Sequence, residues 1–328
     1  MSKDKRILPI WFPVGGVNKR FAFHDPRTAK YFTPDAQNVW PDSAGVPANA
    51  TQADYIRQRG GSRPGLEKAF ATQLGGGAPI RSQGTIQFIS GTQLNRRLVA
   101  ISNGGLYMES SDGASMTSVG GTFNSQKQLQ MIERNQILYI ADHSDDTTNS
   151  SGTNQPKKLA PTGPTVSNWT ASDGTIPYGS ICLALWRDRA VMAGGTTSPF
   201  GVFASRQGDL EDWDYSETDT GAAWALTLAD AGQLGDSVLC LVPHSDDCLV
   251  IFCSTSTWVM RGDPGFGGTV DNLSHHIGCL GPNAACITPN GSIYWMSQDG
   301  LYKMPGGCNA STEGITSVSR ELIPEELV

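Results

Sequence analysis

The sequence predicts an all-β protein, a β-propeller of about six blades that follows an extended N-terminal arm. Two observations carry this prediction. Glycine (38) and proline (19) make up about a sixth of the 328 residues, and only 17% are charged, which suits short strands and turns rather than long helices. In addition, one kind of strand pair recurs along the chain. A repeated unit that cannot bury its own faces implies stacked small sheets.

The clearest repeat consists of an apolar strand, a polar turn and a second strand. Both copies are rich in β-branched and aromatic residues, and both are bounded by Asp, Asn, Gly and Ser. The two copies span residues 246–263 and 289–307. Earlier strands of the same kind are expected at residues 96–101, 106–109, 137–141, 190–194 and 201–205.

The spacing of these units favours a propeller over other all-β folds. The central strands begin near Leu98, Ile137, Ala190, Leu249 and Ile293, which leaves gaps of 39, 53, 59 and 44 residues. Propeller blades recur at intervals of ~40–50 residues, and loop insertions account for the longer gaps. A β-sandwich, whose strands recur every ~8–12 residues, stays open as the alternative.

The chain is predicted to divide at the glycine run that begins at Gly75 and ends at Gly77. Residues 1–75 carry seven prolines and few alternating stretches, so they are interpreted as an extended arm for docking or inter-subunit contact, and residues 76–328 as the propeller. Residues 1–70 have a net charge of +5, whereas the remaining 258 residues have a net charge of -12. Because binding through phosphate neutralisation needs clustered cations, the acidic body is not expected to hold nucleic acid.

The sequence indicates no catalytic, metal or cofactor site. Adjacent residues of a strand point to opposite faces, so His275 and His276 cannot both bind one metal ion without a bend. The seven cysteines lack zinc-knuckle spacing and are interpreted as small buried hydrophobic residues of a reduced protein. Arg261-Gly262-Asp263 matches the integrin-binding tripeptide, but a three-residue match at a strand end is more simply a structural turn. No membrane-spanning segment or signal peptide is expected.

Several stretches resemble a family of bacteriophage tail proteins, the nozzle or stopper proteins of short-tailed phages. Residues 57–65 (RQRGGSRPG) resemble the family's opening segment, and residues 202–214 (VFASRQGDLEDWD) resemble its propeller repeats. Further matching stretches lie at residues 15–18, 36–41, 261–263, 277–279 and 297–302, with Trp258 between them. This chain is shorter than the longer members, which add strands or a tip domain.

The resemblance implies a non-enzymatic structural protein of the virion tail that is assembled in the host cytoplasm. It would form a homo-oligomeric ring, a hexamer, which gates the DNA conduit below the portal and adaptor. Its partners would be adaptor, portal and tail fibre or tailspike proteins, and double-stranded DNA would pass without specific binding along an acidic wall. Candidate interface residues are Trp11, Phe12, Arg57, Arg59 and Arg63, although the arginines could equally cap turns within their own chain.

A second functional hypothesis is a carbohydrate-binding or glycan-hydrolysing propeller that acts in host recognition. It requires Trp169, Trp213 and Trp224 to form an exposed platform for a sugar. Residues 209–217 form the most acidic stretch and are the candidate source of paired carboxylates for hydrolysis.

Overall fold

The structure is a computed structural model in which two compact units are distinguished. It describes residues 39–40, 61–62, 70, 73–111, 113, 115–141, 143, 155–161, 164–227, 236–264, 267–305 and 314–319. The larger unit comprises Ala69–Gln298 and Tyr302–Thr316, and the smaller comprises Met1–Lys68, Asp299–Leu301 and Ser317–Val328. In the smaller unit, strands β1 (Val39–Trp40) and β2 (Gly61–Ser62) form an antiparallel pair.

The described residues form five four-stranded sheets, and within each sheet neighbouring strands are in sequence order, although the third sheet omits β15. After a short 3-10 turn (Gly75–Gly77), the first sheet contains β3 (Ile80–Ser90), β4 (Gln93–Ser102), β5 (Gly105–Glu109) and β6 (Met116–Gly120). The second contains β7 (Met131–Arg134), β8 (Ile137–Ile140), β9 (Lys157–Ala160) and β10 (Thr165–Asn168). The third contains β12 (Cys182–Trp186), β13 (Arg189–Ala193), β14 (Gly201–Ala204) and β16 (Trp224–Thr227).

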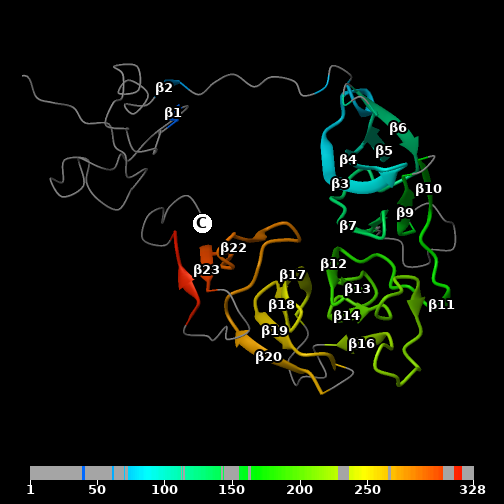
Figure 1. Cartoon of the computed structure of the whole chain (residues 1–328). Coiled ribbons are helices and arrows are strands. Elements are labelled where there is room, and N and C mark those ends of the chain that lie inside the picture. The colour runs from blue at the N-terminus through cyan, green and yellow to red at the C-terminus, as the bar shows by residue number, and fades with distance from the viewer. Residues whose placement is uncertain are drawn as a thin grey trace, which may run out of the picture. The chain divides into compact units, whose positions relative to one another are not determined.

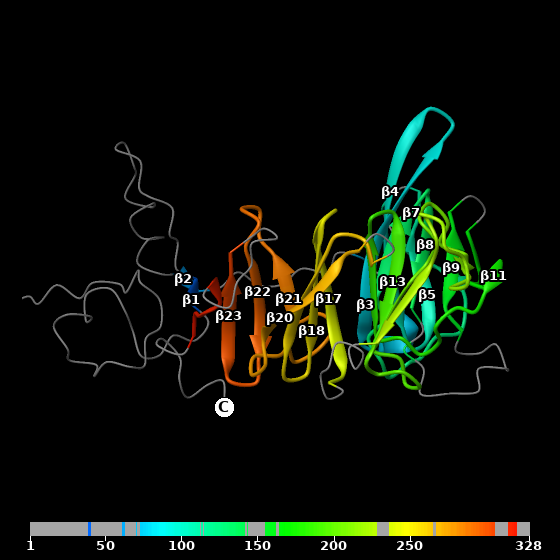
Figure 2. The same ribbon diagram turned by 90° about the horizontal axis from the view of Figure 1, so that it is seen from below.

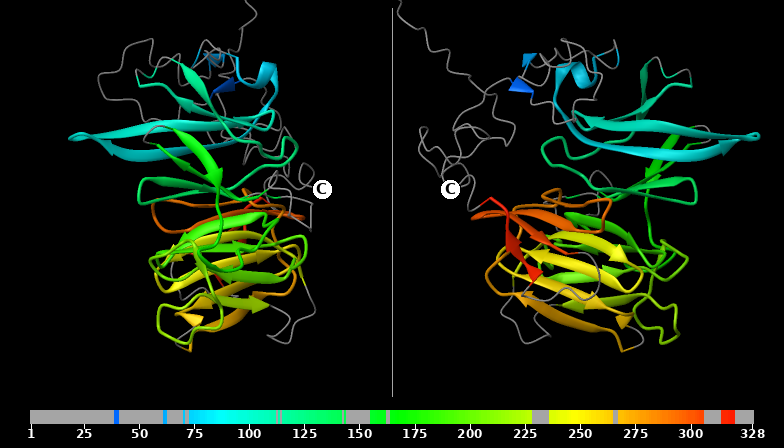
Figure 3. Two further views of the ribbon diagram at one scale, coloured as in Figure 1. Left: turned by 90° about the vertical axis from the view of Figure 1, so that its right-hand side faces the viewer. Right: turned by 60° about the vertical axis from the view of Figure 1, so that its left-hand side comes forward.

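The fourth and fifth sheets follow the same plan. The fourth contains β17 (Val238–Ser245), β18 (Cys248–Cys253), β19 (Thr257–Arg261) and β20 (Thr269–Ser274), and the fifth contains β21 (Ala285–Ile287), β22 (Ile293–Ser297), β23 (Gly300–Met304) and β24 (Thr316–Ser317). One parallel pair, β11 (Asp173–Gly174) with β15 (Asp212–Trp213), lies outside these sheets. The strands β3 and β4 extend past the other strands as a long hairpin (Figures 2 and 3).

The sheets are arranged as the blades of a propeller. Consecutive sheets contact each other through their first strands, β3 with β7, β7 with β12, β12 with β17 and β17 with β21. These strands therefore lie on the inner side, and the later strands of each sheet lie progressively outward (Figure 1). The predicted all-β propeller is confirmed. The five positions that defined the sequence period all fall in second strands: Leu98 in β4, Ile137 in β8, Ala190 in β13, Leu249 in β18 and Ile293 in β22.

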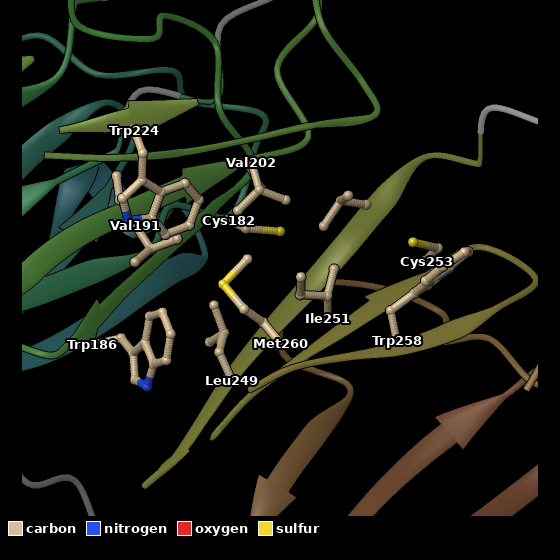
Figure 4. Packing of buried hydrophobic residues seen from close by; sticks show 13 residues of the cluster. Cys182, Trp186, Val191, Val202, Trp224, Leu249, Ile251, Cys253, Trp258 and Met260 are labelled. Atoms are coloured by element: carbon tan, nitrogen blue, oxygen red, sulfur yellow. The ribbon is translucent and has the colours of Figure 1, made fainter. Parts of the chain in front are cut away.

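The core consists of apolar layers between neighbouring blades. One layer joins the third and fourth blades, where Trp186, Val191 and Trp224 meet Leu249 and Met260 (Figure 4). Similar layers join the other neighbouring blades. Five of the six described cysteines are buried, as expected for small apolar residues. Within the described residues, no helix has the length and hydrophobicity needed to cross a bilayer.

Candidate ligand-binding site

The third blade carries a pocket of about 290 Å³, which we call the blade-three pocket. The segment that leads into β12, the loop between β13 and β14, strand β14 and the loop between β15 and β16 all contribute to it. Its lining residues are Thr175, Ile176, Pro177, Tyr178, Ser180, Gly195, Thr196, Thr197, Ser198, Phe203 and Tyr215. Its volume is near the lower end of the range of small-molecule sites, about 300–1,000 Å³.

Consecutive tight turns give the β13–β14 loop a fixed shape. The Ser198 N–H donates to the Gly195 carbonyl at 3.1 Å, and the Gly201 N–H donates to the Ser198 carbonyl at 3.1 Å. On the facing segment, Ser180 Oγ donates to the Pro177 carbonyl at 3.2 Å. Because these backbone and hydroxyl groups bond within their own loops, both walls of the pocket are preformed.

Two glycines make room for the pocket. A Cβ atom at Gly195 would lie 3.2 Å from the Tyr178 carbonyl oxygen, so the glycine lets the two walls approach each other. A Cβ atom at Gly201 would lie 2.5 Å from Cε2 of Phe203, a separation that real Cβ atoms do not tolerate. The glycine at 201 therefore allows the Phe203 ring its position in the pocket wall.

An aromatic pair forms the apolar part of the pocket. The ring centroids of Phe203 and Tyr215 are 6.1 Å apart, and the ring planes are inclined by 41°. The Tyr215 side chain is 37% exposed. Its partial burial raises the pKa of the Tyr215 hydroxyl well above the usual value, so this group stays protonated and can donate or accept a hydrogen bond.

The blade-three pocket has no charged side chain in its lining. None of its lining residues is Asp, Glu, Lys, Arg or His, and the polar groups are the hydroxyls of Thr, Ser and Tyr with the backbone. A bound ion would find no countercharge there and would lose its hydration without compensation. An aromatic surface rimmed by hydroxyls suits a ligand that has both apolar C–H faces and hydroxyl groups.

A second cavity, of about 530 Å³, lies among the first strands of the propeller, and we call it the axial cavity. Its lining residues are Ile80, Arg81, Ser82, Gln83, Gln128, Leu129, Gln130, Met131 and Asn283. Gln130 Nε2 donates to Asn283 Oδ1 and lies 3.4 Å from the Pro282 carbonyl. The charged member of this lining is a cation, Arg81, and no carboxylate belongs to it.

The tryptophans expected to form a sugar platform are buried. Trp169 and Trp213 have no exposed surface, and Trp224 is 8% exposed. The indole N–H groups of Trp169 and Trp213 both donate to the Leu210 carbonyl at 3.0 Å. Their polar, turn-rich surroundings in the sequence did not indicate this burial. The prediction that these three tryptophans form an exposed sugar-binding platform is therefore wrong, and their side chains belong to the core.

The carboxylates of the acidic stretch at 209–217 accept hydrogen bonds from nearby backbone N–H groups or pair with basic side chains. The carboxylates of Asp209, Asp212 and Asp214 each accept a backbone N–H two residues further on, as is usual for Asp in turns. Glu211 pairs with Lys158, and Glu217 pairs with Arg206. The acidic side chains are thus engaged in local turns and ion pairs.

The other residues considered from the sequence are the Arg-Gly-Asp tripeptide, the histidine pair and the candidate interface residues. Asp263 of the Arg-Gly-Asp tripeptide is 6% exposed and is paired with Arg189 inside the protein, so the tripeptide is not displayed. His275 and His276 are both exposed, and no group of three potential metal ligands occurs within the described ranges. The candidate interface residues Trp11, Phe12, Arg57, Arg59 and Arg63 all lie outside the described residues.

Sequence signals for the blade-three pocket were weak. Phe203 lay in an expected strand, and Tyr215 lay in the acidic stretch, where the carboxylates dominated the interpretation. The two are twelve positions apart and come together only because β14 and the loop after β15 meet on one blade. A Ser/Thr-rich loop beside two aromatics was the only available signal, and its meaning depends on the blade geometry.

Comparisons with known proteins give no family for the chain. No family model matches it, and no curated protein matches it. Solved structures do match. One is the extracellular domain of a one-component system from B. thetaiotaomicron, at 9% identity over 77% of this chain and 29% of the other, with a TM-score of 0.48. Another is the extracellular domain of a hybrid two-component system from B. thetaiotaomicron, at 10% identity, 77% and 31% coverage, and a TM-score of 0.46.

A third matching structure is PorZ, a bacterial surface component of the type-IX secretion system of Porphyromonas gingivalis. Its identity is 14%, its TM-score is 0.39, and the match covers 70% of this chain and 27% of PorZ. The chain thus spans less than a third of the length of each of these structures. At such identities and TM-scores the likenesses carry no argument about function.

These findings correct the family assignment made from the sequence. The resemblance to phage tail nozzle proteins is wrong, because no family model supports it and the matching structures named above come from bacterial extracellular and surface proteins. The tail nozzle function and the virion location depended on that resemblance and are wrong with it. Each matching stretch is short, and short sequence matches have a high false-positive risk.

Proposed function

We propose that the chain is a non-catalytic binding module whose blade-three pocket holds a neutral carbohydrate. The observation that carries this proposal is the pairing of Phe203 and Tyr215 with a rim of Ser and Thr hydroxyls in a pocket that has no charged lining residue. A sugar ring presents C–H groups on one face and hydroxyls around its edge. The aromatic pair contacts the C–H face, and the hydroxyl rim exchanges hydrogen bonds with the edge.

The size and polarity of the pocket set the class of ligand. A volume of about 290 Å³ accommodates one or two sugar rings rather than a long chain. A sugar acid or an amino sugar carries a charge, and burying that charge without a partner is costly. The ligand class is therefore neutral hexoses or pentoses, presented singly or at the end of a glycan.

The absence of carboxylates from the pocket lining argues against hydrolysis there. Glycoside cleavage generally uses two carboxyl groups about 5–9.5 Å apart on either side of the scissile bond. The lining contains neither Asp nor Glu. Binding without turnover is accordingly the activity we propose.

A glycan array followed by calorimetry tests this proposal. We expect the protein to bind neutral glycans, and Tyr215→Ala and Phe203→Ala to lose at least tenfold in affinity because each removes one ring of the Phe203–Tyr215 pair. Tyr294→Ala serves as the matched control, since Tyr294 is a half-buried tyrosine of the fifth blade, away from the pocket lining.

The control must bind as tightly as the unmodified protein. Failure to bind any neutral glycan, or equal losses in Tyr294→Ala and Tyr215→Ala, would overturn the assignment. Incubation of a bound glycan with the protein, followed by chromatography of the products, checks that no bond is cleaved.

A further inference from the structure

The axial cavity lies where three first strands begin. Its lining residues come from the start of β3, from the segment that leads into β7, and from the segment that leads into β21. Its volume of about 530 Å³ lies within the range of small-molecule sites, about 300–1,000 Å³. It shares no lining residue with the blade-three pocket, so the two are separate sites.

Hydrogen bonds fix the chain around this cavity. The Leu129 N–H donates to the buried Ser82 hydroxyl at 2.7 Å, which ties the segment before β7 to β3. The Ala141 N–H donates to the Gln130 carbonyl at 3.0 Å. From the fifth blade, Asn283 Oδ1 accepts a hydrogen bond from Gln130 Nε2. The walls that the first, second and fifth blades contribute are therefore held in place before a ligand binds.

The lining combines three kinds of side chain besides the Ser82 hydroxyl. One side chain is a guanidinium, that of Arg81. The side-chain amides belong to Gln83, Gln128, Gln130 and Asn283. The apolar side chains belong to Ile80, Leu129 and Met131. The cavity thus offers one positive charge, hydrogen-bond donors and acceptors, and apolar surface.

Arg81 determines the charge of the ligand that fits this cavity. Within the described part of the chain, no carboxylate is paired with Arg81, and none lines the cavity. Other described arginines are paired with carboxylates, namely Arg134, Arg187, Arg189, Arg206 and Arg261. A guanidinium forms two parallel hydrogen bonds with a carboxylate. The one positive charge of the lining therefore matches a ligand with a single carboxylate.

The same charge balance disfavours other classes of ligand. A phosphate monoester carries a charge of about −1.5 to −2 at neutral pH, which Arg81 alone does not balance. An amine would add a second positive charge to a lining that has no carboxylate. Leaving either charge without a partner in the cavity is costly.

The amides and the apolar side chains define the rest of the ligand. A side-chain amide both donates and accepts hydrogen bonds, so it matches a hydroxyl group. Gln83, Gln128 and Asn283 are exposed, as a ligand contact requires. Ile80 is 56% exposed and offers an apolar surface for C–H groups. A ring that carries one carboxylate, several hydroxyls and C–H groups meets all three requirements.

We propose that the axial cavity is a second binding site, and that its ligand is a uronic acid, free or at the end of an acidic glycan. Arg81 binds the carboxylate, while Gln83, Gln128 and Asn283 exchange hydrogen bonds with the ring hydroxyls. The proposal does not depend on the blade-three pocket. That pocket has no cation in its lining, so a charged sugar would lose its hydration there without compensation.

Calorimetric titration of the full chain with related sugars tests this proposal. The probes are glucuronate and galacturonate, with glucose, glucosamine and glucose 6-phosphate as comparisons of different charge. We expect a uronic acid to bind, and its affinity to fall when NaCl is raised from about 0.05 to 0.5 M, because Arg81 is exposed and its charge is screened. Glucosamine and glucose 6-phosphate should bind about tenfold more weakly or less, since neither balances Arg81.

The two sites are separated by repeating the titrations in Tyr215→Ala, which removes an aromatic ring from the blade-three pocket. Uronic acid binding should persist in this variant. Glucose should bind to it about tenfold more weakly than the uronic acid does, because glucose lacks the carboxylate that pairs with Arg81.

Substitutions of Arg81 identify the group that binds the carboxylate. Arg81→Gln removes the charge and should weaken uronic acid binding about tenfold or more. Arg81→Lys keeps the charge but loses the two parallel hydrogen bonds, so its affinity should fall between the two. Arg96→Gln is the matched control, because Arg96 is an exposed arginine of the same blade outside the cavity lining. It should bind as the unmodified protein does, and near-UV circular dichroism verifies that each variant is folded.

The titrations of the unmodified protein decide the proposal even where a variant does not fold. Failure of both uronic acids to bind would refute it, as would tighter binding of glucose 6-phosphate than of either uronic acid. Equal affinities in Arg81→Gln and Arg96→Gln would also refute it. A failure of neutral glycans to bind the blade-three pocket would leave these outcomes unchanged, because the two sites share no lining residue.

Discussion

Arg189 Nη2 lies 3.3 Å from Asp263 Oδ2, and the two side chains, 1% and 4% exposed, form a buried ion pair between the third and fourth blades. Arg189 Nη1 also donates to the carbonyls of Ser205 at 3.0 Å and Ala222 at 2.6 Å. Burial lowers the pKa of the Arg189 guanidinium, while Asp263 opposes this shift. The Asp263 carboxylate therefore compensates the buried positive charge of Arg189, the first residue of β13.

Asp263→Asn should destabilise the protein by about 3–5 kcal/mol, because it leaves the buried Arg189 charge without a countercharge. Urea denaturation followed by tryptophan fluorescence measures the change in unfolding free energy. Asp271→Asn is the control, since Asp271 is 50% exposed and pairs with a half-exposed Arg261. Exposed pairs contribute about 0–1 kcal/mol. Equal losses in the two variants would contradict a special role for the buried pair.

Trp213→Ala should lower the unfolding free energy by about 3–5 kcal/mol, as expected for truncation of a fully buried aromatic side chain. The change removes the bond to the Leu210 carbonyl and the edge contact with Trp169, whose ring centroid is 6.0 Å away. Thermal and urea unfolding measure the loss. If Trp213 were exposed, its removal would leave the unfolding free energy nearly unchanged. A loss below about 1 kcal/mol would therefore contradict the burial of this side chain.

The ionisation of Asp236 makes part of the unfolding free energy depend on pH. Burial raises the pKa of Asp236, but hydrogen bonds from Ser254, Ser256 and Thr255 outweigh this effect and hold the pKa below its usual value. A depressed pKa in the folded state means that the stabilisation is present above the unfolded pKa of about 3.9. It is lost as the pH falls through the lower folded value.

Asp236→Asn should therefore flatten the fall in unfolding free energy below about pH 4 and cost about 1.5–3 kcal/mol at pH 7, where the charged hydrogen bonds are intact. Urea titrations at pH values from 2 to 7 measure both effects. Asp246→Asn, in an exposed turn, is the matched control. If both variants gave the same slope below pH 4, Asp236 would not be the group responsible.

The sequence was sufficient to locate the second strand of each described blade, and the clearest signals came from β13 and β18, which are buried at every position. Strand β18 reads Cys-Leu-Val-Ile-Phe-Cys and is buried at all six positions, so its apolar run is continuous and visible. First strands are harder to recognise. In β3 the buried Ser82 lies between Arg81 and Gln83, which line the axial cavity, and in β7 only Ile132 is buried. Neither strand has a continuous apolar run, and such a pattern resembles an edge strand.

The candidate site was not predictable from the sequence for a physical reason. Exposure decides whether an aromatic residue binds a ligand or fills a core, and exposure depends on how blades stack. Trp169, Trp213 and Tyr215 all lie in polar, turn-rich segments, yet the two tryptophans are fully buried and Tyr215 is 37% exposed. Local composition does not distinguish these outcomes, whereas the packing between the second and third blades does.

Ligand binding in the blade-three pocket should be independent of pH between about 5 and 9. The lining holds no carboxylate, imidazole or amine, and its one group whose pKa is shifted, the Tyr215 hydroxyl, has that pKa raised by partial burial. Because the folded pKa lies above the usual value of about 10, this hydroxyl stays protonated throughout that range.

Calorimetric titrations of a neutral glycan at several pH values measure the affinity directly. Tyr215→Phe keeps the ring and removes the hydroxyl, so it should lose less affinity than Tyr215→Ala and should remain insensitive to pH. An affinity that changed with an inflection between pH 5 and 9, in the unmodified protein or in Tyr215→Phe, would place a titrating group in contact with the ligand and exclude the neutral pocket as the binding site.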